Sequence, residues 1–146
     1  MSWWYYTVKK DPSWRGRPPQ MLPPDVPVWH RWLAQHQDEL EYVLYNFAIT
    51  IQNPPNHLPD RIVSSWMYSA AVRIDAVAFT KEKKFLVIEV TQHAHLRCVG
   101  QIITYITLMR DIDPFQAEYI PLVVCETVNA DTRYVLKKFN INIEEV

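Results

Sequence analysis

The chain of 146 residues is long enough for one domain with a substantial core, and 49% hydrophobic with 21% charged residues is a globular composition. A formal net charge of −1 argues against a non-specific nucleic-acid binder, which is normally basic. No run of about 18 apolar residues is present, so no membrane partner is expected. The absence of a secretory leader pattern and of metal-type cysteine spacing predicts a cytoplasmic protein.

Residues 1–25 differ in composition from the rest of the chain. They hold three tryptophans, four basic residues and 5 of the 11 prolines, without helical or strand periodicity. We therefore expect an extended, partly polyproline-like arm. Its aromatic side chains need cover, on the domain itself or on a partner. We favour docking on other proteins of an assembly, with nucleic-acid binding by the basic and aromatic side chains as the alternative.

Residues 26–146 are predicted to form a layered α/β domain with a central mixed sheet flanked by helices. Residues 61–69 fit neither helix nor strand clearly, and 53–60 form a proline-rich loop. The predicted elements are a helix over 26–40 capped by Asp25, a strand over 42–51, strands over 71–79 and 85–91, a helix over 94–110, a strand over 119–125, a helix over 131–139 and a strand over 141–146.

Two acids interrupt the apolar strands at 71–79 and 85–91. If the charged connection between them is a hairpin turn centred on Glu82, Asp75 lies directly opposite Glu89 on the same face. Two like charges there are unfavourable unless a cation, a shared proton or a basic side chain offsets them. The pair therefore indicates a site for Mg²⁺ or Mn²⁺. In the alternative interpretation the acids are structural, and Arg73, opposite Thr91, is their counter-ion.

Three segments carry a resemblance to a known family: residues 73–79, residues 85–91, and the following helix with Gly100-Gln101 and Tyr105. With the order of elements over 26–146, they resemble the PD-(D/E)XK nuclease superfamily, whose members have a restriction-endonuclease-like core. The resemblance implies that Asp75 and Glu89 bind Mg²⁺ and that Gln101 lies near the site. It also offers Glu41 as an acid contributed from the end of the first helix.

One position departs from that family. The family has a Lys two residues after the Glu, where this chain has Thr91, so the chain resembles a degenerate member. Threonine carries no charge to activate water or to stabilise developing negative charge. The lysines within 80–84 lie at the far end of the hairpin. The candidate replacements are Arg73 and Arg97 as cations and His93 and His95 as bases.

Two hypotheses of function follow. We favour a structural protein with lost or vestigial catalysis and no cofactor, held in an assembly of other proteins or of its own copies through residues 1–25. The resemblance suggests a phage virion component near the head–tail connector. The alternative is an active nuclease that hydrolyses phosphodiester bonds, with Asp75 and Glu89 as ligands of Mg²⁺ or Mn²⁺. A third interpretation is a nucleic-acid-binding module that uses the same cleft without cutting.

Overall fold

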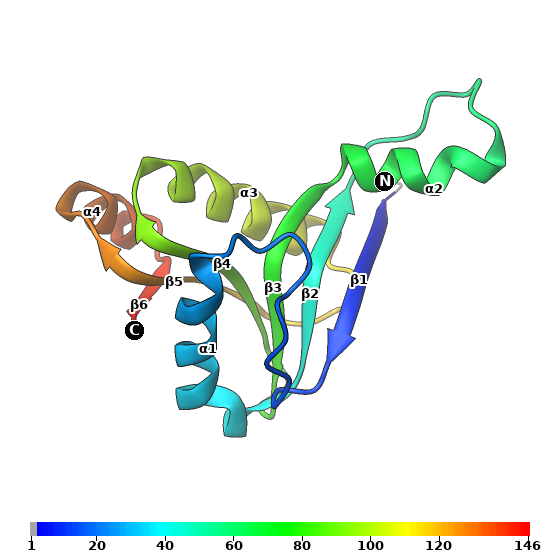
Figure 1. Cartoon of the computed structure of the whole chain (residues 1–146). Helices are drawn as coiled ribbons and strands as arrows, with labels where there is room; N and C mark the ends of the chain where they lie inside the picture. Colours follow the sequence, from blue (N-terminus) through cyan, green and yellow to red (C-terminus); the bar gives the residue numbers. More distant parts are fainter. Residues whose placement is uncertain (1–2) are drawn as a thin grey trace.

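A six-stranded mixed sheet forms the centre of the computed structural model, which describes residues 3–146 (Figure 1). The elements are β1 (Trp4–Lys10), α1 (Asp25–His36), the 3-10 turn η1 (Gln37–Glu39), β2 (Leu40–Thr50), α2 (Asp60–Ala70), β3 (Val72–Thr80), β4 (Phe85–Ala94), α3 (Leu96–Ile112), β5 (Tyr119–Val128), α4 (Ala130–Lys138) and β6 (Asn142–Glu145). The strands lie side by side in chain order. Pairings from β1 to β4 are antiparallel, and those from β4 to β6 are parallel.

Helices cover both faces of this sheet. α1 packs on β4 and β5 from one side, and α3 packs on the same strands from the other (Figure 1). Successive side chains of β4 point to opposite faces of the sheet and so pack in both layers. Val87 packs on the α3 side, whereas Ile88 and Val90 pack on the α1 side. The predicted layered α/β fold with a central mixed sheet is therefore confirmed.

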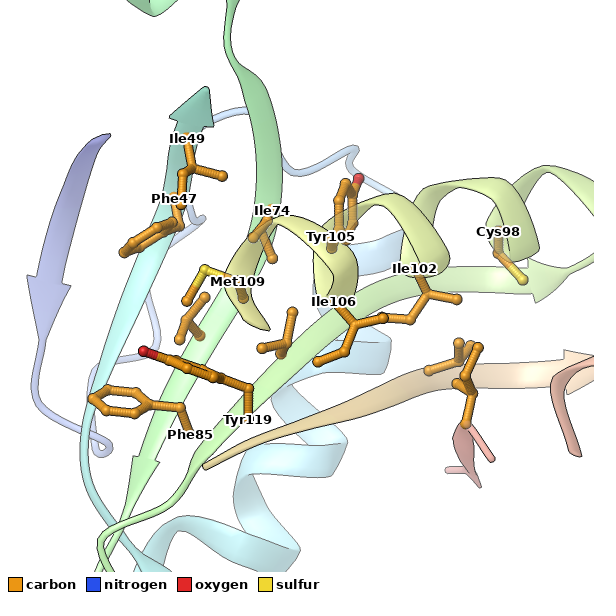
Figure 2. Packing of buried hydrophobic residues seen from close by; sticks show 14 of the residues in the cluster. Phe47, Ile49, Ile74, Phe85, Cys98, Ile102, Tyr105, Ile106, Met109 and Tyr119 are labelled. Atoms are coloured by element: carbon orange, nitrogen blue, oxygen red, sulfur yellow. The ribbon is translucent and has the colours of Figure 1, made fainter. Parts of the chain in front are cut away.

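Each layer has its own apolar core. On the α3 side, Figure 2 shows Ile102, Ile106 and Met109 directed from the helix onto the sheet. On the α1 side Trp29 is fully buried, and its indole Nε1 donates a hydrogen bond of 2.8 Å to the hydroxyl of Tyr45. This bond satisfies a polar group that would otherwise be costly inside the core.

The two cysteines, Cys98 and Cys125, are buried free thiols. No helix within residues 3–146 is long and apolar enough to cross a membrane.

The β3–β4 hairpin has the register that its sequence predicts. Phe79 pairs with Phe85 and Val77 with Val87, as symmetry about Glu82 requires. The ladder continues to Ala76 and Ile88 and includes no pair beyond them. The hairpin therefore brings the positions of the two acids to the end of the paired region.

The N-terminal segment corrects one prediction. Residues 4–10 form the edge strand β1, in which Tyr6 pairs with Ala48 and Lys9 with Leu44 of β2. The prediction that residues 1–25 lack strand structure is therefore wrong for this part. The register shifts between Tyr6 and Val8, which interrupts the period of two that identifies a strand. Residues 1–2 lie outside the described part of the chain.

Two other elements differ from expectation. Pro24, not Asp25, occupies the cap position of α1, and the Asp25 carboxylate accepts a hydrogen bond of 2.8 Å from the backbone N–H of Gln92. The ambiguous stretch 61–69 lies within α2, which extends away from the sheet (Figure 1). Ile62, Val63, Trp66 and Met67 recur at helical spacing, but Met67 alone is buried among the residues of α2. The apolar stripe is therefore present in the sequence, and the structure covers it only in part.

Because β1 belongs to the sheet, a chain beginning at Asp11 should be less stable. The truncation removes the six residue pairs between β1 and β2. At about 0.5 kcal/mol for each pair, the free energy of unfolding should fall by roughly 3 kcal/mol. Urea denaturation followed by circular dichroism measures this loss. A chain lacking only residues 1–2 keeps all of β1 and is the control. An unchanged midpoint for the chain beginning at Asp11 would mean that β1 adds no stability.

Candidate active site

A cavity of about 390 Å³ lies where β3 begins, β4 ends and α3 begins. All five residues singled out from the sequence line it. They are Arg73, Asp75, Glu89, Thr91 and Gln101. The cavity is also lined by His93, His95 and Arg97, which with Arg73 are the candidates for the cation or base that Thr91 does not supply. The fold thus gathers side chains from two strands and a helix around one space.

The two acids are adjacent in this cavity. Where the ladder ends, Asp75 Oδ2 accepts a hydrogen bond of 2.8 Å from the backbone N–H of Val90. The carboxyl groups of Asp75 and Glu89 interact directly, and each changes the pKa of the other. Glu89 is only 5% exposed, and its Oε2 is buried without a hydrogen-bond partner.

Burial governs the ionisation of both acids. Desolvation raises the pKa of Asp75 from 3.8 to about 6, against the hydrogen bond from Val90, which lowers it. Desolvation also raises the pKa of Glu89 well above its usual range, and the charge of Asp75 adds to this rise. The hydroxyl of Tyr105, beside Glu89, acts in the opposite direction. The pair therefore tends to retain a proton near neutral pH.

Asp25 is a third acid at this site. Its charge raises the pKa of both Asp75 and Glu89 further, and its own pKa is raised by burial. Glu41, which the resemblance offered for such a role, is wrongly predicted. It lies at the other end of the sheet, where its carboxylate is 3.6 Å from Nζ of Lys83. The approach of the α1 N-terminus to β4 depends on long-range packing, which the sequence pattern does not reveal.

Arg73 does not serve as the counter-ion of the acids. Its Nη2 donates a hydrogen bond of 3.0 Å to the carbonyl of Tyr68, and its guanidinium lies 4.3 Å from the centre of the Tyr68 ring. Within residues 3–146 it forms no ion pair with Asp75 or Glu89. The arginine instead ties β3 to the end of α2, and Thr91 contributes no charge to the cavity.

Sequence reasoning missed two parts of the cavity wall. Asn46 lies in β2 with a φ of 48°, a left-handed conformation that Asn tolerates better than most residues. Its Nδ2 donates a hydrogen bond of 2.7 Å to the Tyr68 hydroxyl, and its Oδ1 is buried without a partner. A lone Asn in an apolar strand was the available signal. The second part is Pro19, Gln20 and Leu22, from the segment predicted to dock elsewhere.

The acids fit a hard divalent cation. They supply oxygen ligands, one of them a buried Oε2 without a partner, and a cation would offset their repulsion. No group of three or more His, Cys, Asp or Glu side chains in residues 3–146 is arranged to hold a metal ion. Mg²⁺ is often held by one or two carboxylates, with water and substrate oxygens completing its shell. Asp75 and Glu89 would be the two protein ligands.

Comparisons with known proteins support the fold. No protein-family model matches the chain, and no curated protein matches its sequence. The crystal structure of a repair endonuclease from Pyrococcus abyssi matches with a TM-score of 0.52 and 11% sequence identity. The match covers 90% of this chain and 49% of the endonuclease, so the chain spans about half the endonuclease's length. The chain therefore has a nuclease-like fold with a restriction-endonuclease-like core.

The raised pKa values predict how stability changes with pH. The folded state holds protons more tightly than the unfolded state at Asp75 and Glu89, so this pair lowers stability as pH rises from about 4 through 6 and above. In EDTA, Glu89→Gln should therefore become more stable than the wild type as pH increases from 5 to 8, by about 1–2 kcal/mol.

Chemical denaturation at each pH measures this difference, with Glu41→Gln as the control because Glu41 lies away from the cavity and in an ion pair. Adding Mg²⁺ should stabilise the wild type and leave Glu89→Gln less affected. If the difference in stability between the wild type and Glu89→Gln does not vary with pH, Asp75 and Glu89 do not have the raised pKa values described here.

Proposed function

We propose that the chain is a divalent-metal-dependent nuclease that hydrolyses phosphodiester bonds in the cavity around Asp75 and Glu89. One observation carries the proposal: two adjacent, largely buried carboxyl groups share a cavity without forming an ion pair to a basic side chain of residues 3–146. Such a pair lowers the stability of a fold that binds no cation. A protein with a purely structural role would be more stable with neutral amides at these positions.

The nuclease-like fold supports the same class of reaction. A solved protein that shares it is a repair endonuclease. Fold alone does not determine chemistry, so the proposal depends on the acid pair and its cavity.

The residues around the acids have distinct tasks in this reaction. The Val90 N–H orients Asp75, and Tyr105 lies beside Glu89. Gln101 precedes Tyr105 by four residues on α3 and brings an amide to the cavity, suited to a water or a phosphate oxygen. The bound metal would polarise the phosphate and lower the pKa of the attacking water. The attacking water gives up a proton to the solvent as its oxygen forms a P–O bond, the P–O bond to the leaving oxygen breaks, and the leaving oxygen takes a proton from the solvent.

A structural role in a larger assembly is the second candidate. Thr91 favours it, because this residue brings no charge to the cavity. The free edge of the sheet also favours it, since Trp3, Tyr5 and Tyr6 are 40%, 40% and 45% exposed. Exposed aromatic side chains beside an edge strand suit contact with another protein. On the sequence resemblance, the proposed setting of this role is a phage virion, near the head–tail connector.

Cleavage assays decide between the candidates. With Mg²⁺ or Mn²⁺ the wild type should cut supercoiled plasmid or a single-stranded oligonucleotide, and EDTA should abolish cutting. Glu89→Gln and Asp75→Asn should lower the rate at least about 100-fold, because each removes a metal ligand. Glu41→Gln, which removes an acid outside the cavity, should leave the rate unchanged. No cutting by the folded wild type, or full activity of Glu89→Gln, would refute the proposal.

A further inference from the structure

We infer that Arg97 binds a phosphate oxygen of the substrate, supplying the positive charge that Thr91 lacks; this rests on the proposed nuclease function. Arg97 lies in the first turn of α3 and lines the same cavity as Asp75 and Glu89. Its side chain is exposed, whereas those acids are largely buried. A long basic side chain at the mouth of the cavity is well placed to meet an incoming anion.

The charge of Arg97 acts on Tyr105 and is not among the influences on the pKa values of Asp75 and Glu89. Burial and the charges of Glu89 and Asp75 raise the pKa of Tyr105, and the charge of Arg97 opposes that rise. Tyr105 lies beside Glu89, and Figure 2 shows its hydroxyl turned away from the apolar cluster under α3. Arg97 forms no ion pair or hydrogen bond with the side chains of residues 3–146. Its guanidinium donors therefore remain available to a ligand.

The other basic candidates have partners or lie elsewhere. Arg73 donates a hydrogen bond to the Tyr68 carbonyl and lies over the Tyr68 ring, and its Nε donor is buried, so it is less accessible than Arg97. The His93 ring makes a hydrogen bond of 2.7 Å with the Thr127 hydroxyl. Lys83 and Lys84 form ion pairs with Glu41 and Glu118 at the opposite end of the hairpin. His95 is exposed just before α3 and is the remaining alternative to Arg97.

The charges in the cavity favour the same assignment. Asp25 and Arg73 also line the cavity, and their opposite charges offset one another. The ionised carboxylates of Asp75 and Glu89 and one divalent cation sum to zero, so the single negative charge of a phosphodiester is left uncompensated. Arg97 balances that charge. Guanidinium presents several N–H donors in a planar fork that matches phosphate oxygens, and it stays protonated. Arg97 is thus suited to bind the phosphate and to stabilise its growing charge, and not to accept a proton.

Binding measurements test the assignment separately from catalysis. A fluorescein-labelled single-stranded oligonucleotide is titrated with protein in Ca²⁺ buffer at several salt concentrations, with fluorescence anisotropy as the signal. Arg97→Gln should weaken binding about 10-fold. The slope of log K against log salt should become shallower by about 0.7, the value for one phosphate contact on a single strand. Arg97→Lys should recover part of the affinity, because it keeps the charge.

Arg61→Gln is the matched control, because Arg61 is an exposed arginine on α2, outside the cavity. It should retain the wild-type Kd and salt slope. The Tm of Arg97→Gln should equal that of the wild type, since Arg97 is exposed. In Mg²⁺, Arg97→Gln should also cut about 100-fold more slowly than Arg61→Gln.

The outcomes separate this inference from the proposed function. An unchanged Kd, salt slope and cleavage rate for Arg97→Gln, with cutting still lost in Glu89→Gln, would overturn the role of Arg97 and leave the nuclease standing. Loss of the phosphate contact in His95→Gln and not in Arg97→Gln would overturn it too. Absence of both binding and cutting in the folded wild type would overturn both proposals.

Discussion

The site depends on the hydrogen bond from the Val90 N–H to Asp75 Oδ2, 2.8 Å long. Up to Ala76 and Ile88 the two strands pair through their backbones. Beyond that pair, the side chain of Asp75 replaces a backbone carbonyl as the acceptor for the Val90 N–H. This hydrogen bond satisfies the amide of Val90 and also holds Asp75 against Glu89. The sheet therefore stabilises an arrangement of two acids that electrostatic repulsion alone would separate.

The N-terminal segment closes the site from the other side. Strand β1 joins its first part to the sheet, and the bond from Gln92 N–H to Asp25 fixes its end beside β4. Between these two attachments, Pro19, Gln20 and Leu22 line the cavity. Its prolines reduce the conformational freedom that the segment loses on ordering. The segment whose composition suggested a separate arm therefore forms one wall of the cavity. It also places the carboxylate of Asp25 beside the other two acids.

Local patterns predicted the sheet best where its geometry is regular. The β3–β4 register follows from a symmetric hairpin, and Asp75 and Glu89 could be paired from spacing alone. Irregular positions escaped prediction: β1 contains a register shift after Tyr6, and Asn46 has a positive φ. Asp25 escaped it for another reason, since its place beside the pair follows from how α1 packs on β4. Sequence spacing encodes contacts along neighbouring strands and carries little information on contacts between distant layers.

A lysine at position 91 could both stabilise negative charge and help to activate water, and Thr91 can do neither. The strength of charge stabilisation depends on the distance between the charges and not on the element that carries the cation. Arg97 reaches the cavity from α3, and Thr91 reaches the same cavity from β4. An arginine can perform this electrostatic task but cannot take the proton of the attacking water. The raised pKa values of Asp75 and Glu89 show how strongly this cavity disfavours uncompensated negative charge. A bound cation would reverse that preference, leaving the acids ionised and the metal as the group that lowers the pKa of the water. A neutral residue at position 91 is thus compatible with catalysis, provided that the metal supplies the activation and Arg97 the remaining charge.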